Sequence, residues 1–141
     1  MIRIVIDTDV MVAAFESANG ASRQVLMHVL DKRAELVLST PLMIEYEAVL
    51  TRPAVLARSG LTPAEVYEVL DELASICVPV GFDYRWRPAA RDPDDDLVLE
   101  TAVNGTAAVI ATFNVRDLAS AGSAFGIQVE RPAQVLRRIG S

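Results

Sequence analysis

Acidic and amide side chains stand where strands of this chain are expected to end. Asp7 directly follows the apolar run IRIVI, and Asp9 lies two residues further on. A run of acids at 92–96, DPDDD, opens a helical pattern, and Asn114 and Asp117 follow the apolar segment AAVIAT. Carboxylate and amide oxygens are the ligands that hard divalent cations prefer. The pattern therefore indicates chemistry at a bound Mg²⁺ or Mn²⁺ ion.

Residue types that would support other catalytic chemistry are scarce. The chain has one histidine, His28, one cysteine, Cys77, and one lysine, Lys32. A zinc site of His and Cys ligands is excluded by this inventory. His28 stands at the edge of an apolar helical face and is interpreted as a surface residue, which argues against Ser-His-Asp catalysis. Cys77, in the apolar setting ASICVPV, is predicted to be a buried core thiol.

Helical geometry separates the acids at 94–96. The apolar stripe of their helix consists of Val98, Leu99, Ala102 and Val103. At about 100° per residue, Asp95 projects onto the middle of this stripe, whereas Asp94 and Asp96 fall on its flanks. A carboxylate that points inward needs a partner, because an isolated buried charge is very costly. A metal ion shared with Asp7 would be such a partner; an acid favoured by the helix dipole is the alternative.

The other acids also have structural interpretations. Asp7 or Asp9 could cap the helix that follows them. Asn114 could cap a helical turn, with Asp117 at the third position of a capping box. Glu45 lies in the first turns of a helix beside its apolar stripe, where an acid is commonly a surface residue. Capping does not exclude function, because these side chains would still project at one edge of a sheet.

Alternating strands and helices are required to position these residues. Strands are predicted at 2–6, 35–39, 78–80, 107–112 and 126–130. Helices are predicted at about 9–17, 22–33 with Ser22 as N-cap, 41–51 with Pro41 first, 63–76, 93–104, a short turn at 115–120, and 132–139. The segment 81–93 is expected to be a loop. Strands that are apolar almost throughout favour an α/β fold, with a parallel sheet covered by helices on both faces. In such sheets, ligands bind beyond the carboxyl ends of the strands.

Length and composition describe one globular domain over residues 1–141, with 52% hydrophobic and 23% charged residues. No apolar run reaches the length of a membrane span, and no secretory signal is visible, so a cytoplasmic protein is expected. The net charge of −6 argues against broad non-specific binding of nucleic acid. It leaves room for an enzyme that meets phosphates only at metal ions.

Together these segments resemble the PIN-domain family of metal-dependent ribonucleases, and especially the toxins of bacterial toxin–antitoxin pairs. VIDTDVMVAAF resembles the opening strand with the first acid, Asp7, although the family usually has Asn where Asp9 stands. STPLMIEYEAVL resembles the segment that carries the second acid, Glu45. DPDDDLVLETAVNGTAAVIATFNVRDL is the most specific match, and its third acid falls on Asp95. The fourth position, often Asp, is Asn114.

The resemblance implies a three-layer α/β/α sandwich with about five parallel strands, and endonucleolytic cleavage of RNA with Mg²⁺ or Mn²⁺. Asp7 and Asp95 would hold the essential ion. Glu45 would complete the cluster or orient the attacking water. Asn114 and Asp117, which matches an additional acid of the family, would position a metal-bound water or a second ion.

The resemblance also implies contacts with RNA and with partner proteins. Thr112 would hydrogen-bond a phosphate or the Asp7 carboxylate. The candidates for guiding RNA, which are alternatively solvated charges, are Arg85, Arg87, Arg91 and Arg116. Such proteins are usually neutralised by a cognate antitoxin and often form homodimers. The helices at 41–51 and 63–76 could expose the groove for such a partner.

Three other functions stay open. DTDV after a strand resembles the opening of haloacid dehalogenase-type phosphatases, with Asp7 as nucleophile, but Met11 stands where Thr or Val is expected and Lys32 lies too early. A phosphorelay receiver domain would need a lysine after a late strand, where this chain has Phe113. The third is a PIN fold that has lost catalysis and only binds RNA or a partner, because two positions depart from the family pattern.

Overall fold

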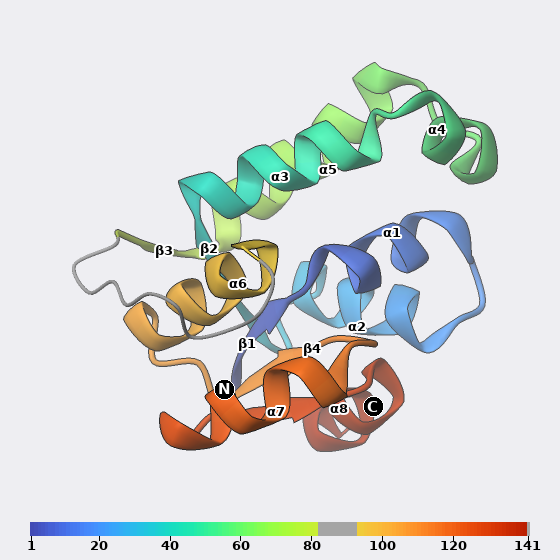
Figure 1. Cartoon of the computed structure of the whole chain (residues 1–141). Coiled ribbons are helices and arrows are strands. Elements are labelled where there is room, and N and C mark those ends of the chain that lie inside the picture. Colours follow the sequence, from blue (N-terminus) through green and yellow to red (C-terminus); the bar gives the residue numbers. More distant parts are fainter. Residues whose placement is uncertain (82–92, 141) are drawn as a thin grey trace.

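The centre of the molecule is a parallel sheet (Figure 1). A computed structural model of the chain describes residues 1–81 and 93–140, with the backbone alone at 93–96. Over these residues the strand order is β3-β2-β1-β4-β5, and every pairing is parallel. The strands are β1 (Arg3–Ile6), β2 (Glu35–Ser39), β3 (Val78–Val80), β4 (Val109–Ala111) and β5 (Gln128–Glu130). The predicted α/β fold with five parallel strands is confirmed.

Helices cover both faces of this sheet. They are α1 (Thr8–Glu16), α2 (Ala21–Leu30), α3 (Thr40–Leu50), α4 (Pro53–Ser59), α5 (Pro63–Ile76), α6 (Pro93–Asn104), α7 (Val115–Ala124) and α8 (Pro132–Ile139). The connection from β1 to β2 and that from β3 to β4 run in opposite directions across the sheet, so right-handed crossovers place α2 and α6 on opposite faces. α7 contacts α6, and α8 contacts α2. Figure 1 shows α3 and α5 side by side, with α4 at their far end.

The strongest local signal of the sequence forms as predicted. Thr62 Oγ1 accepts a hydrogen bond from the Glu65 amide at 3.2 Å, and Glu65 Oε1 accepts one from the Thr62 amide at 3.0 Å. Pro63 is the first residue of α5, where its missing N–H costs nothing. The buried residues of α5 are Val66, Leu70 and Leu73. The capping box and the apolar stripe therefore determine both the start of this helix and the face that it buries.

Several predicted boundaries are wrong. Gly20, not Ser22, is the N-cap of α2, and Ser22 is buried inside the helix. Pro41 is the second residue of α3, because Ser39 is the N-cap. Helix α4 was not predicted: its opening Pro53 resembles a helix stop in sequence, but proline also suits a first turn.

Helix α7 is longer than the turn predicted at 115–120. It continues to Ala124 through Gly122, a residue that disfavours helix interiors. The packing explains its presence, because a Cβ at Gly122 would lie 2.7 Å from Val129 Cγ2. Glycine thus allows α7 to approach β5 closely. None of the described helices has the length and apolar character needed to span a bilayer.

Candidate active site

Asp7 directly follows β1 and precedes the first residue of α1. Its side chain is 8% exposed, and it is the N-cap of α1, with Oδ1 accepting from the Thr8 amide at 2.7 Å. Its own amide donates to the Ala111 carbonyl of β4 at 2.9 Å, so the backbone at Asp7 is held to the neighbouring strand. The capping interpretation applies to Asp7 and not to Asp9, which lies within α1. Capping occupies one lone pair and leaves the carboxylate at the carboxyl edge of the sheet.

Thr112 holds the second oxygen of this carboxylate. It follows β4 directly, is fully buried, and donates from Oγ1 to Asp7 Oδ2 at 2.7 Å. The same Oγ1 accepts from the Asn114 amide at 2.9 Å. Of the two ligands proposed for Thr112 from the sequence, the structure places it on the Asp7 carboxylate. The hydroxyl fixes the orientation of Asp7 and links it to the start of α7.

Asp9 takes part in the same edge of the sheet. It lies in the first turn of α1, and its Oδ2 accepts from the Phe113 amide at 3.2 Å. Two acids at the start of α1, the N-cap Asp7 and Asp9, therefore bind the segment after β4: Asp7 through Thr112, and Asp9 through the next backbone amide. Asp9 is a structural member of this edge, and its role does not depend on a helix cap.

Glu45 is brought to this edge by helix α3. Thr8 Oγ1 donates a hydrogen bond to Glu45 Oε2. The next residue, Tyr46, is completely buried and donates from its hydroxyl to the carbonyl of Ile6, the last residue of β1. Burial, followed by the charges of Asp7 and Glu45, raises the pKa of Tyr46 well above the usual tyrosine value. Glu45 is thus a partly buried acid near Asp7 and not a fully exposed surface residue.

Asp95 belongs to α6, whose direction places its start at the same edge. At the other end of that helix, Arg3 Nη1 at the beginning of β1 donates to the Gly105 carbonyl at 3.3 Å. Since α6 packs along β1, its first turn lies towards the carboxyl end of β1. Three residues of the predicted stripe, Val98, Leu99 and Ala102, are fully buried. The side chains of Asp94, Asp95 and Asp96 lie outside the described residues, as do Arg85, Arg87 and Arg91.

The predicted site residues at the start of α7 have fewer contacts with the acids. Asn114 is the N-cap residue, but its side chain makes no capping hydrogen bond, so the predicted capping box with Asp117 is wrong. Asp117 and Arg116 are exposed in the first turn of α7. In the described part of the chain, neither forms a hydrogen bond or ion pair with Asp7. Their assignment to the site stays a prediction.

The oxygen donors at this edge suit a hard divalent cation. Asp7 and Glu45 come from different elements and lie near the same buried phenol. Among the side chains that the structure describes, no group of three or more histidines, cysteines and acids is close enough to hold a metal ion. The sequence assigns the third carboxylate to Asp95, whose helix starts at this edge. The donor chemistry therefore fits Mg²⁺ or Mn²⁺, with Asp7 as the best-oriented ligand.

The lone cysteine and histidine lie away from these acids. Cys77 caps the end of α5 and is only partly buried, so the predicted core thiol is wrong. Desolvation raises its pKa, which keeps the thiol protonated and unreactive near neutral pH. His28 is partly exposed in α2, with Nδ1 3.4 Å from Arg33 Nη1. Neither residue supplies a nucleophile or a base to the carboxyl edge.

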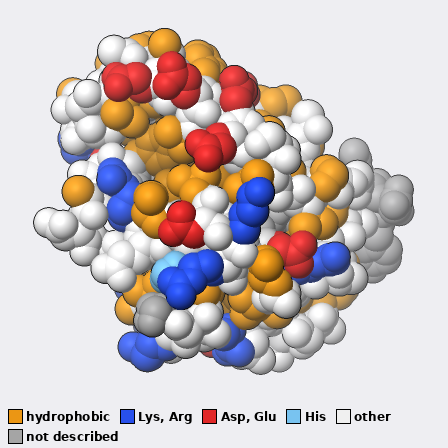
Figure 2. All heavy atoms as spheres, turned by 180° about the vertical axis from the view of Figure 1, so that it is seen from behind, with side chains coloured by type: hydrophobic (Ala, Val, Ile, Leu, Met, Phe, Trp, Pro, Cys, Tyr) orange, Lys and Arg blue, Asp and Glu red, His pale blue; other side chains and the backbone are white. Residues whose placement is uncertain are grey.

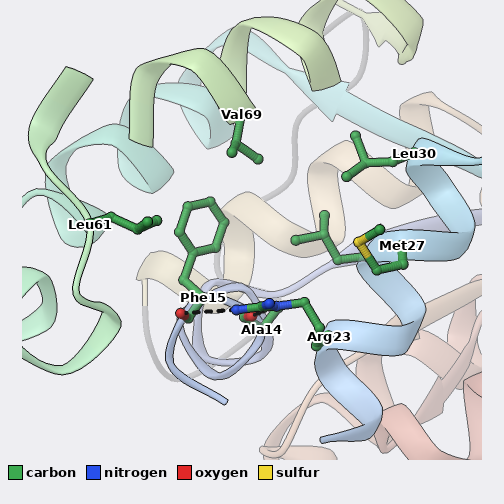
Figure 3. Close-up of a pocket in the computed structure, with 8 residues that line it drawn as sticks. Ala14, Phe15, Arg23, Met27, Leu30, Leu61 and Val69 are labelled. Carbon is green, nitrogen blue, oxygen red and sulfur yellow. Dashed lines mark hydrogen bonds between the residues drawn. The ribbon is translucent and has the colours of Figure 1, made fainter. Parts of the chain in front are cut away.

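A separate apolar hollow of about 220 Å³ lies between α1, α2 and the start of α5. Figure 2 shows hydrophobic side chains gathered in a hollow on this face, with acidic side chains above it and the single histidine below it. In Figure 3, Phe15, Leu61 and Val69 point towards one another across it. Arg23 is committed to the end of α1, where its guanidinium donates to the carbonyls of Ala14 and Phe15. No acid lines this hollow, so it has no part in metal chemistry.

Sequence reasoning did not find two residues that assemble the site. Thr8 links Asp7 to Glu45, and Tyr46 links α3 to β1. Their hydroxyls join residues 37 and 40 positions apart, which no local pattern encodes. The available signal was a tyrosine directly after a candidate acid on a buried helical face, because a buried phenol needs a hydrogen-bond acceptor.

Comparison with known proteins identifies a family. The PIN domain model matches residues 3–116 of the chain. The match includes Asp7, Glu45, Asp95 and Asn114, and it ends one residue before Asp117. No curated protein matches the chain.

Proposed function

Because the chain belongs to the PIN domain family, whose members are typically nucleases, we propose that it is a metal-dependent endoribonuclease. One observation carries the proposal: the buried Asp7 carboxylate is held on both oxygens at the carboxyl edge of β1. Thr8 brings Glu45 to the same edge, and the helix of Asp95 starts there. Metal dependence and the choice of RNA rest on the donor chemistry and on the family resemblance.

The residues divide the work of hydrolysis. Asp7 and Asp95 would hold the ion, and Thr112 and the Thr8 amide keep Asp7 in one orientation. The ion, when bound, neutralises phosphate charge and makes water a better nucleophile. Glu45 lies next to Asp7 and would orient the attacking water and accept its proton. The water oxygen would bond to phosphorus, the bond from phosphorus to the leaving oxygen would break, and that oxygen would take up a proton from solvent.

The remaining roles extend this proposal. Asn114 and Asp117 would position water or a second ion, and Arg116 would contact the RNA backbone from the exposed first turn of α7. On the family resemblance, we further propose a cytoplasmic bacterial toxin that is neutralised by a cognate antitoxin and that forms a homodimer. The apolar hollow between α1, α2 and α5 supports a protein partner, since a groove of this kind accepts an apolar helix face.

The test is cleavage of RNA by matched acid variants. Purified protein is incubated with total cellular RNA and with synthetic tRNA in Mn²⁺, Mg²⁺ or EDTA. We expect fragments only with metal, and a loss of at least about a hundredfold in Asp95→Asn. Asp94→Asn and Asp96→Asn remove the same charge from neighbouring positions and should retain most activity.

The outcomes separate the competing functions. Equal cleavage by Asp95→Asn would show a contaminant or a wrong assignment of the third acid. Metal binding by calorimetry without cleavage of any RNA would favour a PIN fold that only binds RNA or a partner. Release of phosphate from a small aryl phosphate, lost in Asp7→Asn, would instead support a phosphatase.

A further inference from the structure

A second hollow, of about 320 Å³, lies at the carboxyl ends of β4 and β5. Its volume falls in the range of small-ligand pockets, about 300–1,000 Å³. Small side chains of α1 and of the first turn of α2 form one wall, and Phe113 and Arg131 belong to the other. The hollow is distinct from the apolar one of Figure 3, with which it shares no lining residue.

Phe113 and Arg131 stand at the ends of neighbouring strands. The Thr112 amide donates to the Glu130 carbonyl at 2.9 Å, which continues the pairing of β4 with β5. The next residues along each strand are Phe113 and Arg131, and both line the hollow. Phe113 is 40% exposed, so part of its ring is open to a ligand in the hollow.

The guanidinium of Arg131 is available to a ligand. In the described part of the chain, no carboxylate forms an ion pair with it, whereas Arg138 on the same helix is paired with Glu130. The first turn of α2 faces the same hollow behind Gly20, an N-cap without a side-chain hydrogen bond. The Arg131 guanidinium and the amino end of α2 thus both bring positive charge to this hollow.

Hydrogen bonds link one wall of the hollow to the acids. Phe113 donates its amide to Asp9 at 3.2 Å, and its neighbour Thr112 holds Asp7 at 2.7 Å. A ligand bound on Phe113 would thus lie beside the metal-binding edge. An exposed aromatic ring, a guanidinium and a nearby phosphodiester-cleaving site together match one nucleotide of a single strand, since unstacked bases stack on aromatic rings and phosphates bind arginine.

We propose that this hollow is a nucleotide subsite for single-stranded RNA. The base of one unpaired nucleotide next to the scissile phosphate stacks on Phe113, and a phosphate of that nucleotide binds Arg131. The proposal rests on the proposed ribonuclease function, because that function supplies the strand. It makes Phe113 and Arg131 substrate-positioning residues that set a preference for unpaired RNA.

The stacking contact is tested by binding without cleavage. Fluorescence anisotropy measures the affinity of a labelled single-stranded RNA in EDTA for the wild type and for Phe113→Ala. We expect affinity to fall about tenfold in the variant. Phe125→Ala is the matched control, because Phe125 is 39% exposed but lies at the far end of α7. Thermal melting of each variant establishes that it is folded.

A scan of abasic nucleotides identifies the base. Oligonucleotides that each lack one base should show one position where the loss costs the wild type about tenfold in affinity. The same abasic nucleotide should not change the affinity of Phe113→Ala, because this variant lacks the ring on which the base stacks. Equal sensitivity of the two proteins at every position would overturn the stacking contact.

The phosphate contact is tested by salt dependence. Log affinity falls linearly with log salt between about 50 and about 200 mM. In Arg131→Gln this fall should be less steep by about 0.7, the value for one phosphate of a single strand. Phe113→Ala should leave this slope unchanged. Arg137→Gln removes an exposed arginine from the last turn of the same helix and should alter neither affinity nor slope.

Failure of the subsite and failure of the nuclease function give different results. If the wild type cleaves RNA but Phe113→Ala and Arg131→Gln bind like the wild type, the subsite is wrong and the nuclease stands. If the wild type binds single strands through both residues but cleaves nothing, the subsite stands and the nuclease is wrong. No binding of single-stranded RNA by the wild type, or equal loss on duplex RNA, would overturn the subsite.

Discussion

Asp7 combines two roles that are often separate. Its Oδ1 begins a helix, and its Oδ2 accepts the Thr112 hydroxyl, so both oxygens are held before any ion binds. A carboxylate that is 8% exposed would be costly without such donors. The two bonds lower the cost of burial and restrict the rotation of the side chain. Both effects favour metal binding, because the ligand is ordered in advance.

The Thr112 hydroxyl can be removed with little change of shape. In Thr112→Val, the buried Asp7 carboxylate loses one donor, and we expect the free energy of unfolding to fall by about 2 kcal/mol. Affinity for Mn²⁺ should fall as well. Urea unfolding in EDTA and titration calorimetry measure the two effects. Thr112→Ser keeps the hydroxyl and should restore most of both; an equally weak Thr112→Ser would show that the methyl group matters instead.

The hydrogen bond that Asp9 accepts does not need a charged side chain. Asp9 accepts the Phe113 amide at 3.2 Å, and an asparagine carbonyl can accept the same bond. Asp9→Asn should therefore change stability by less than about 0.5 kcal/mol, whereas Asp9→Ala should cost about 1 kcal/mol. Thermal melting in EDTA compares them. A large loss in Asp9→Asn would show that the charge itself is needed.

At the scale of elements, the site depends on one buried phenol. Tyr46 attaches α3 to the end of β1, which fixes where Glu45 stands relative to Asp7. The other buried residues of α3, Leu42 and Leu50, make ordinary apolar contacts. Apolar packing is non-directional and holds α3 against its neighbours. The hydrogen bond of the Tyr46 hydroxyl is directional and therefore fixes the position of α3 relative to β1.

Removal of that hydroxyl has a pH signature. Tyr46→Phe leaves the Ile6 carbonyl without this donor and should lower stability by about 1–2 kcal/mol at pH 7. The pKa of Tyr46 is raised in the folded state, so above pH of about 10 the unfolded chain loses a proton that the folded chain keeps. Wild-type stability then falls as pH rises, by up to about 1.4 kcal/mol per pH unit, and the variant lacks this contribution.

Urea unfolding from pH 8 to pH 11 measures this difference. The gap between wild type and Tyr46→Phe should narrow as the pH rises above about 10. Tyr67→Phe is the control, because Tyr67 is 44% exposed and should give a constant difference close to zero. A gap that stays constant for Tyr46→Phe would mean that its phenol ionises equally in both states.

For the whole molecule, metal binding and folding should be linked. A metal that binds only the folded chain adds about 2.7 kcal/mol at a hundred times its dissociation constant, or about 8 °C in Tm for a chain of this size. We expect this shift for Mn²⁺ with the wild type and its loss in Asp7→Asn. Asp71→Asn removes an exposed acid of α5 and should show the same shift in Tm as the wild type. An equal shift in all three proteins would indicate non-specific binding of cations.

The two hollows lie on different parts of the molecule, so contact with a nucleic acid strand and contact with a partner protein would use different surfaces. The hollow with Phe113 and Arg131 adjoins the acids and suits a nucleic acid strand. The hollow with Phe15 and Val69 is apolar, lies between helices and holds no acid (Figure 3). A partner protein on the apolar hollow would leave the hollow with Phe113 and Arg131 accessible, unless the partner also extended a segment across the sheet edge.

Much of this arrangement follows from local patterns. Apolar runs specified the strands, and the sequence around Thr62 specified the start of α5, because hydrogen bonds between near neighbours form wherever the local types are right. The same patterns placed Asp7 at the carboxyl end of a buried strand. They failed at Ser22 and Pro41, because residues within two positions of each other could each begin a helix and the helix started at the earlier one.

The contacts that build the site could not be predicted in this way. Thr112 and Asp7 are 105 positions apart, and Thr8 and Glu45 are 37 apart. Strand order brings the first pair together, and the packing of α3 against α1 brings the second. Such pairings depend on how layers stack, a property of the whole chain that no local window of residues contains. The sequence by itself therefore determined which acids end the strands, and the folded arrangement decided which hydroxyls hold them.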